Sequence, residues 1–194
     1  DQADCTLHVF ENAAASTATT AAVITTRIGL PVRLRDDQAV LVNGEPLVPT
    51  DSDGRYAATI PLADTYTVTV SEPTRGVQDT PLAAPPDFAV TAPTAGAAAS
   101  LSGFTVTWTN ADPDLQVMIA LSQTLFDQER RLVVGPFADA GGRSFGAADL
   151  SEFRQGADLF INVTKISRRA SIGGFDSGDS SVWRSRSVAV APAP

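Results

Sequence analysis

Apolar and polar residues alternate along much of the chain, and the clearest run is Phe-Thr-Val-Thr-Trp-Thr at 104–109. Successive side chains of an extended strand point to opposite faces. Phe104, Val106 and Trp108 therefore fall on one face, and the three threonines fall on the other. This pattern predicts a half-buried strand with Trp108 in the core of a β domain.

Similar short runs recur between turn signals. Residues 40–42 are Val-Leu-Val and lead into Asn43-Gly44, the dipeptide favoured in two-residue hairpins. Tyr66, Val68 and Val70 share one face of another predicted strand. Further predicted strands lie at 55–60, 88–90, 115–121, 132–134, 159–166, 182–183 and 188–190. Many short strands bounded by turns are typical of an all-β sandwich or barrel.

Helical signal is weak in this chain. The best candidate is 146–153, where Leu150 and Phe153 stand three residues apart and could share one face of a single turn. We therefore expect at most one helical turn, which would cap one end of a sandwich.

The domain boundary is predicted from proline content. The segment 81–86 contains three prolines, which fix the backbone and remove donors, as in a semi-rigid linker. A new first strand follows at 87–96. We therefore predict an N-terminal domain at 1–83 and a C-terminal domain at 87–190. Because few contacts cross such a joint, we expect the C-terminal domain to fold alone.

Several phrases resemble known modules. The Val-Asn-Gly hairpin at 42–47, the phrase ending in Thr-Ile-Pro-Leu at 54–62 and the strand 66–70 resemble bacterial extracytoplasmic Ig-like modules. Residues 88–93 with 104–109 are similar to the opening of fibronectin type III-like modules. The resemblance implies two tandem Ig-like or fibronectin-like β-sandwich domains in a cell-envelope protein. It brings no catalytic residues, and the cysteine pair of antibody domains is absent.

Composition limits the classes of function. The hydrophobic fraction of 43% is enough for a packed core. A net charge of -8 argues against nucleic acid, which is usually bound by a basic face, and against anionic lipid surfaces. No apolar run approaches the roughly 18 residues that a membrane-spanning helix needs, so we expect no transmembrane segment.

Cys5 is the one cysteine, so the chain has no intrachain disulfide and must be stable through its cores. Asp4 directly before it makes Cys5 a poor lipoprotein acylation site, and we expect it to begin a strand. The exported-looking composition and the abrupt start at Asp1 predict that a signal or lipid anchor lay upstream. We therefore expect a bacterial extracytoplasmic protein, which is periplasmic, anchored to the outer membrane or secreted.

Candidate catalytic groups are few. His8 is the one histidine, and Cys5 would point to the other face of the same strand. A closed zinc site needs four ligands, mostly cysteine and histidine. Ser144 sits in a G-x-S-x-G match at 142–146, but no histidine follows it to complete a triad. No phosphate-binding glycine motif occurs. We predict a protein that is not an enzyme and holds neither metal nor cofactor.

Three acidic segments could be mistaken for calcium loops. They are 51–54, 112–114 and 176–179. In the first, an EF-hand loop would need a ligand where Arg55 stands and a glutamate where Leu62 stands. Aspartate beside glycine or proline is ordinary turn chemistry, and we favour that reading for all three.

Basic residues gather late in this acidic chain. If their two segments are neighbouring strands, they could form a patch around a tryptophan, and tryptophan and arginine are enriched at binding hot spots. The alternative is a solvated strand face on which arginine stems cover apolar surface. The candidate binding residues are Lys165, Arg168, Arg169, Trp183, Arg184 and Arg186.

The sequence thus favours a non-catalytic, exported cell-envelope protein for adhesion, scaffolding or protein binding. Its partner would be an acidic protein or an anionic glycan. A carbohydrate-binding module is the alternative, and it would require exposed aromatic rings that stack on sugars. A hydrolase using Ser144 or a pair of carboxylates ranks last.

Overall fold

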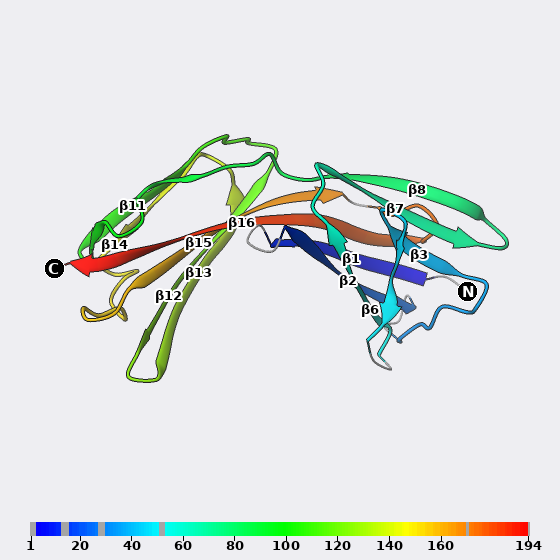
Figure 1. The fold of residues 1–194 in the computed structure, drawn as a ribbon, viewed down its shortest axis with the longest axis horizontal. Coiled ribbons are helices and arrows are strands. Elements are labelled where there is room, and N and C mark those ends of the chain that lie inside the picture. Colours follow the sequence, from blue (N-terminus) through cyan, green and yellow to red (C-terminus); the bar gives the residue numbers. More distant parts are fainter. Residues whose placement is uncertain (1–2, 13–15, 27–29, 51–52, 170, 194) are drawn as a thin grey trace. The chain divides into compact units, whose positions relative to one another are not determined.

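The computed structural model describes residues 3–12, 16–26, 30–50, 53–169 and 171–193. Within these ranges the chain forms sixteen strands and no helix, so no helix there could cross a membrane (Figure 1). The chain divides into two compact units. Unit 1 comprises Asp1–Pro85 and Ile166–Arg184, and unit 2 comprises Pro86–Lys165 and Ser185–Pro194. The all-β prediction is confirmed.

Unit 1 is a sandwich of two sheets. One sheet has the order β15-β16-β1-β2-β6-β5, and the other has the order β4-β3-β7-β8. Inward-facing Leu7 and Val9 of the first sheet pack with Tyr66 and Val68 of the second. The strands are β1 (Ala3–Asn12), β2 (Thr17–Thr26), β3 (Ala39–Val42), β4 (Glu45–Pro46), β5 (Val48–Pro49), β6 (Arg55–Pro61), β7 (Thr65–Glu72), β8 (Gly76–Ala83), and parts of β15 (Leu159–Arg169) and β16 (Ser177–Ala193).

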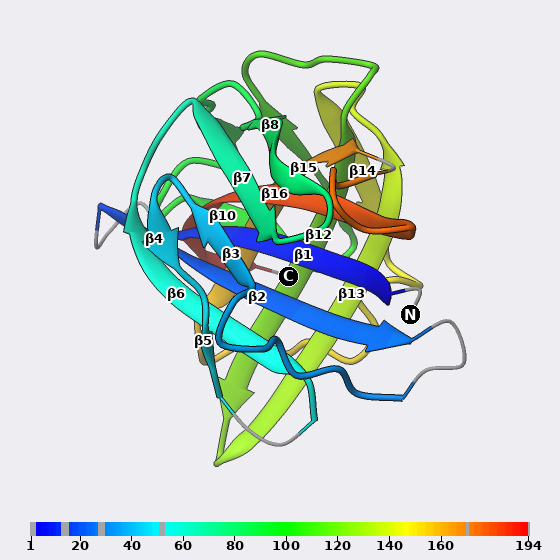
Figure 2. The ribbon, with the colours of Figure 1, turned by 90° about the vertical axis from the view of Figure 1, so that its right-hand side faces the viewer.

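In the larger sheet, the first strand of the chain pairs with the last. β1 lies between β2 and β16 (Figure 2) and pairs with β16 in parallel, from Asp4 opposite Ser177 to Glu11 opposite Arg184. The strands approach closely at Gly178, where an added Cβ would lie 1.9 Å from the carbonyl oxygen of Cys5. Only glycine fits at this position, so it permits the parallel pairing to begin.

Unit 2 is also built from two sheets. β13, β12, β15 and β16 form one, to which β10 adds beside β16, and β14-β11-β9 form the other. Val106 and Trp108 face inward as predicted, with Trp108 only 5% exposed, and they pack with Ile119 and Ile161. The remaining strands are β9 (Val90–Ala92), β10 (Ala98–Ser100), β11 (Gly103–Trp108), β12 (Gln116–Leu125), β13 (Gln128–Ala138) and β14 (Gly142–Gly146).

The expected helical turn at 146–153 is present only as turns. The amide of Leu150 donates to the carbonyl of Gly146, and no regular helix continues from it. Leu150 and Phe153 are nevertheless buried in the core of unit 2, as their spacing predicted.

The observed division differs from the predicted tandem domains of 1–83 and 87–190. The first break falls between Pro85 and Pro86, where the sequence has its proline-rich segment. However, residues 166–184 belong to unit 1, because β16 supplies the parallel neighbour of β1. Local turn signals mark where a chain bends, but they carry no information about a strand partner more than 170 residues away.

This arrangement predicts the behaviour of a fragment. We expect residues 86–194 alone to leave 177–184 without its β1 partner, so the amides of that segment should exchange rapidly with solvent. In the full chain the same amides should be protected, because both neighbouring strands are present. Hydrogen exchange followed by NMR measures this difference. Equal protection of 177–184 in the fragment and the full chain would contradict the pairing.

Candidate binding surface

The six basic-patch candidates do not share one surface. Adjacent residues of a strand face opposite ways, which separates Arg168 from Arg169 and Trp183 from Arg184. Lys165 is fully buried and Arg184 is only 7% exposed, so neither can belong to a surface patch. Arg186 is half-buried, where it pairs with Asp87 and lies over the ring of Phe88. The predicted patch is therefore wrong as a single surface.

Arg184 is part of a buried network in unit 1. Its guanidinium forms a two-pronged ion pair with Glu11, in which Nη2 lies 3.0 Å from Oε1 and Nε contacts Oε2. The hydroxyl of Tyr66 donates to the same Oε1 at 2.8 Å. Burial, together with this hydrogen bond to Glu11, raises the pKa of Tyr66 to about 12. These groups satisfy one another inside the sandwich, so their role is structural.

Lys165 is part of a second buried network, in unit 2. Its Nζ lies 2.8 Å from Oδ2 of Asp139, while Trp108 Nε1 donates to Oδ1 at 2.6 Å. Lys165 also donates to the backbone carbonyls of Thr109 and Asn110. Burial alone would raise the pKa of Asp139, but the hydrogen bonds from Lys165 and Trp108 hold it below 3.8. Sequence reasoning missed Asp139 as the partner of Lys165.

The exposed chemistry of unit 1 lies on the outer face of β1 and β16. His8, Phe10 and Trp183 form an aromatic cluster, with ring centroids 5.9 Å apart for the two pairs containing His8 and 5.5 Å apart for Phe10 and Trp183. The parallel register sets Phe10 beside Trp183 and His8 beside Ser181. Phe10 is 40% exposed, and the other two rings are half-buried. The aromatic cluster is thus an accessible, ordered set of rings.

Ser181 fixes the orientation of two of these rings. Trp183 Nε1 donates to its hydroxyl oxygen at 2.6 Å, and Nδ1 of His8 lies 2.7 Å from the same atom. An indole can only donate, so the hydroxyl proton of Ser181 is available to Nδ1 of His8. In that arrangement Nε2 of His8 carries the ring proton, and it has no hydrogen-bond partner among the described residues.

Arg168 borders the same face on the next strand. The side chains of Asn162 and Ser187, and those of Thr164 and Ser185, are hydrogen-bonded at 2.8 Å, which makes β15 and β16 antiparallel. The same register continued along the strands brings Arg168 opposite Ser181. The guanidinium of Arg168 is exposed and has no ion-pair or hydrogen-bond partner in the described part of the chain.

An open hollow of about 560 Å³ lies beside Arg168. Arg168, Arg169, Ser180 and Ser181 line it, together with the backbone of β8 near Pro81. Arg169 is held there, because its Nη1 donates to the carbonyl of Pro81 at 2.9 Å. Of the six candidates, Trp183 thus belongs to the aromatic cluster, Arg168 lies on the same face of the sheet, and Arg169 lies on the opposite face of β15.

Beyond the rings, the outer face carries mostly small side chains. Antiparallel pairing with β2 sets His8 beside Ala21 and Phe10 beside Thr19, and β6 continues the two rows with Ala57 and Thr59. These alanine and threonine side chains are small and are exposed or half-buried, while Val48 beside Ala57 and Val23 further along β2 are exposed aliphatic side chains. The aromatic cluster therefore borders a surface formed by Thr19, Ala21, Ala57 and Thr59, which we call the shelf.

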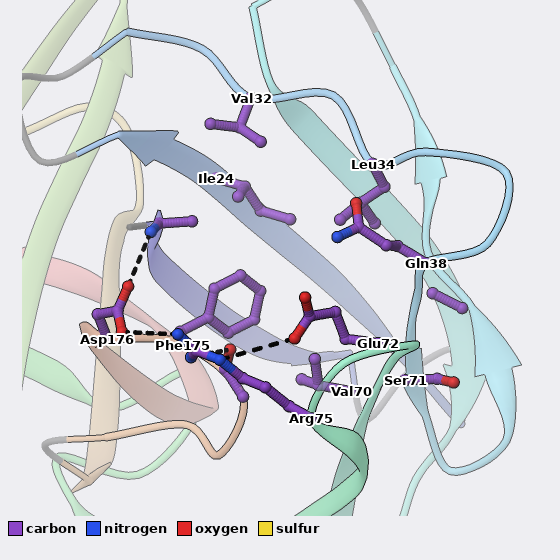
Figure 3. Close-up of a pocket in the computed structure, with 13 residues that line it drawn as sticks. Ile24, Val32, Leu34, Gln38, Val70, Ser71, Glu72, Arg75, Phe175 and Asp176 are labelled. Atoms are coloured by element: carbon purple, nitrogen blue, oxygen red, sulfur yellow. Dashed lines mark hydrogen bonds and ion pairs between the residues drawn. The ribbon is translucent and has the colours of Figure 1, made fainter. Parts of the chain in front are cut away.

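A second cavity opens at one end of the unit 1 core (Figure 3). Ile24, Val70 and Phe175 form its apolar lining, and Arg75 lies at its rim. Arg75 pairs with Glu72 at 3.6 Å and with Asp176 at 3.1 Å, and these three are its charged lining residues. The three charges sum to -1, and Gln38 and Ser71 also line the cavity (Figure 3), so it offers a ligand polar as well as apolar contact.

The nucleophile candidates are placed unfavourably for catalysis. Ser144 lies within strand β14, rather than on a strand-to-helix turn, and its hydroxyl is 2.9 Å from that of Thr105. No cluster of three or more metal-ligating side chains occurs among the described residues. Asp112 accepts from the amide of Asp114, as expected for a turn, while Asp51 and Ser52 lie outside the described residues.

Cys5 lies in β1, where it faces the core of unit 1 and is fully buried. Burial, reinforced by the charge of Asp179, raises the pKa of its thiol to about 12. We predict that Cys5 will not react with iodoacetamide at pH 8 in the folded protein, since the thiolate is the nucleophile. Mass spectrometry should find full labelling only in denaturant. Rapid labelling of the native protein would contradict the placement of Cys5.

Sequence reasoning missed His8 and Phe10. The available signal was their spacing of two on a strand whose other face carries Cys5, Leu7 and Val9. Such alternation predicts that His8 and Phe10 face outward together. The approach of Trp183 could not be predicted in this way, because it depends on the parallel pairing of β1 with β16.

Comparison with known proteins adds little to this description. No protein-family model matches the chain, and no curated protein matches it. One similar solved structure is described as "Crystal structure of chicken CNTN1 FN1-FN3 domains", with 13% sequence identity and a TM-score of 0.29, over 100% of this chain and 67% of that chain. A similarity this low carries no argument about function. The β-sandwich architecture therefore rests on the strands and sheets described above.

Proposed function

We propose that the protein is a non-catalytic binding module whose recognition surface is the outer face of β1 and β16 in unit 1. The observation that carries this proposal is the exposed aromatic cluster of His8, Phe10 and Trp183. Tyr56, Tyr66 and Trp108 are buried, which leaves Trp183 as the accessible residue of these two types. Tryptophan beside an unpaired arginine is the composition of binding hot spots.

The placement of the reactive groups supports a non-catalytic role. The Cys5 thiol is buried with a pKa of about 12, Ser144 contacts a threonine hydroxyl, and Ser181, which contacts His8, is buried and also accepts from Trp183. General acid–base or nucleophilic chemistry requires such groups to converge on a shared position. The extracytoplasmic, bacterial setting of the module is the part of this proposal that rests on the sequence resemblance alone.

Arrays of immobilised glycans and peptides test the proposal with the full chain. We expect Phe10→Ser and Trp183→Phe to weaken binding to whichever ligands the wild-type protein binds. The matched control is Phe160→Ser, which removes a 51% exposed ring from unit 2. Thermal melts must show that all three variants stay folded. Equal binding by all variants, or no wild-type binding to any ligand, would count against the proposed surface.

A further inference from the structure

We propose that the ligand of this surface is an anionic glycan, a saccharide chain bearing carboxylate or sulfate groups, and this inference rests on the proposed function. Three features carry it: the aromatic cluster, the shelf of small side chains beside it, and the unpaired guanidinium of Arg168. The aromatic cluster matches the apolar face of a sugar ring, the shelf matches the sugar hydroxyl groups, and Arg168 matches the negative charge.

The apolar contact comes from the rings. A sugar ring has a face of C–H groups that packs against an aromatic ring, whose flat π-surface is both apolar and electron-rich. Phe10 supplies the most exposed ring, and Trp183 and His8 support it at centroid distances of 5.5 and 5.9 Å. Because Trp183 and His8 are both held by Ser181, little side-chain entropy is lost on binding.

The shelf beside the rings suits an extended saccharide better than a protein partner. Ala21, Ala57, Thr19 and Thr59 are small, and the two exposed aliphatic side chains of this face, Val23 and Val48, lie on different strands rather than together. Stable protein interfaces bury about 800 Å² per partner around a core enriched in large apolar residues. Threonine hydroxyls and the free Nε2 of His8 instead match the hydroxyl groups of a sugar chain.

The charges on this face determine where the anionic group lies. Arg168 lies opposite Ser181, so it is diagonal to Trp183 on the next strand and to Phe10 one strand further, which is roughly 8 to 12 Å at ordinary strand and residue spacings. Asp179 and Asp4 lie on the same face, one and two register steps from Ser181 on the side away from Phe10 and Trp183. An anionic group bound by Arg168 is therefore favoured on the side of the rings and disfavoured on the side of Asp179. A guanidinium binds carboxylate or sulfate through two parallel hydrogen bonds.

Isothermal titration calorimetry with the full chain tests the inference against four probes. They are a hexagalacturonate for carboxylate, a heparin-derived hexasaccharide for sulfate, uncharged maltohexaose, and a hexaglutamate peptide. We expect at least one anionic saccharide to bind, and maltohexaose to bind more weakly. Arg168→Gln should weaken that binding about tenfold, because it removes one charge-assisted contact. High salt should weaken it too, since exposed charges are screened.

The matched control is Arg131→Gln, which removes an exposed arginine from β13 of unit 2 and should leave the affinity unchanged. Because the Arg168 side chain is exposed, the Arg168→Gln variant should have the same melting temperature as the wild type. If hexaglutamate binds as tightly as either anionic saccharide, and loses affinity in Arg168→Gln, the glycan inference fails while the proposed binding surface survives. Equal binding of maltohexaose, or no saccharide binding at all, also overturns the inference.

Discussion

Replacing Asp139 with asparagine is expected to lower the free energy of unfolding of unit 2 by about 3–5 kcal/mol, the usual effect of breaking a buried ion pair. The Nζ of Lys165 lies 2.8 Å from Asp139 and is fully buried, so the variant leaves its charge uncompensated inside the core. Asparagine can still accept the hydrogen bond from Trp108 through Oδ1, while its Nδ2 group replaces the oxygen that contacts Lys165 and accepts from the amide of Asp112. Urea denaturation followed by Trp108 fluorescence, in a Trp183→Phe background, measures the change.

A double variant serves as the control for this prediction. Asp139→Asn with Lys165→Met removes both charges, and it should recover much of the stability lost by the single variant, because no unpaired ion stays buried. A loss below about 1 kcal/mol for Asp139→Asn alone is the scale of an ordinary surface substitution. That result would mean that Lys165 and Asp139 do not form a buried pair.

The same pair predicts how stability depends on pH. The pKa of Asp139 is lowered in the folded protein from its ordinary value of 3.8, so the unfolded chain binds the proton more tightly. The stabilisation is therefore fully present above that value, and it is lost as the pH falls through the folded-state pKa. We expect unit 2 of the wild-type protein to lose stability below about pH 4, and the double variant to lose less.

Glu11→Gln is the second substitution with a large expected effect, again about 3–5 kcal/mol, this time in unit 1. Glutamine can still accept the hydrogen bond from Tyr66, but Arg184 is left buried without its counter-charge. Trp183 is adjacent to Arg184 in β16, so its fluorescence, in a Trp108→Phe background, reports the unfolding of unit 1.

Glu72→Gln provides the matched comparison for Glu11→Gln. It breaks the ion pair with Arg75, which is partly exposed to solvent, and should cost no more than about 1 kcal/mol. If the two glutamine variants lose equal stability, then burial of the Glu11–Arg184 pair does not govern its contribution.

The strands of both cores could be predicted from the sequence, because alternation is a local property. Val106 and Trp108 in β11, and Tyr66, Val68 and Val70 in β7, are buried as their spacing indicated. The proline-rich segment also lies where the first unit ends. The division of β15 and β16 between the units could not be predicted, because it depends on which distant strand each one pairs with.

The candidate site could be predicted less well than the strands, because its contacts also depend on residues that are distant in the sequence. Lys165 and Arg184 look like surface charges in sequence, since lysine and arginine are rarely buried without a partner. Their partners, Asp139 and Glu11, are 26 and 173 residues away, and nothing local connects them. Arg168 and Trp183 were identified from the sequence, but His8 and Phe10 join them only through the parallel pairing of β1 with β16.

The proposed function therefore depends on one surface of unit 1. The chain has two tryptophans, and their indole N–H groups have different partners: Trp108 donates to Asp139 in a core, and Trp183 donates to Ser181 beside the exposed rings. Each gives one indole signal in a 15N-correlated NMR spectrum, and a Trp183→Phe variant assigns the two. They report separately on the proposed surface and on the core of unit 2.

Titration of the 15N-labelled full chain with the tightest ligand from the arrays is the most direct test of the proposed surface. We predict that the Trp183 indole signal, and the amides of residues 7–11 and 180–184, will shift on binding, while the Trp108 indole signal stays in place. Shifts confined to Trp108 and other residues of unit 2, with the Trp183 signal unmoved, would contradict the account.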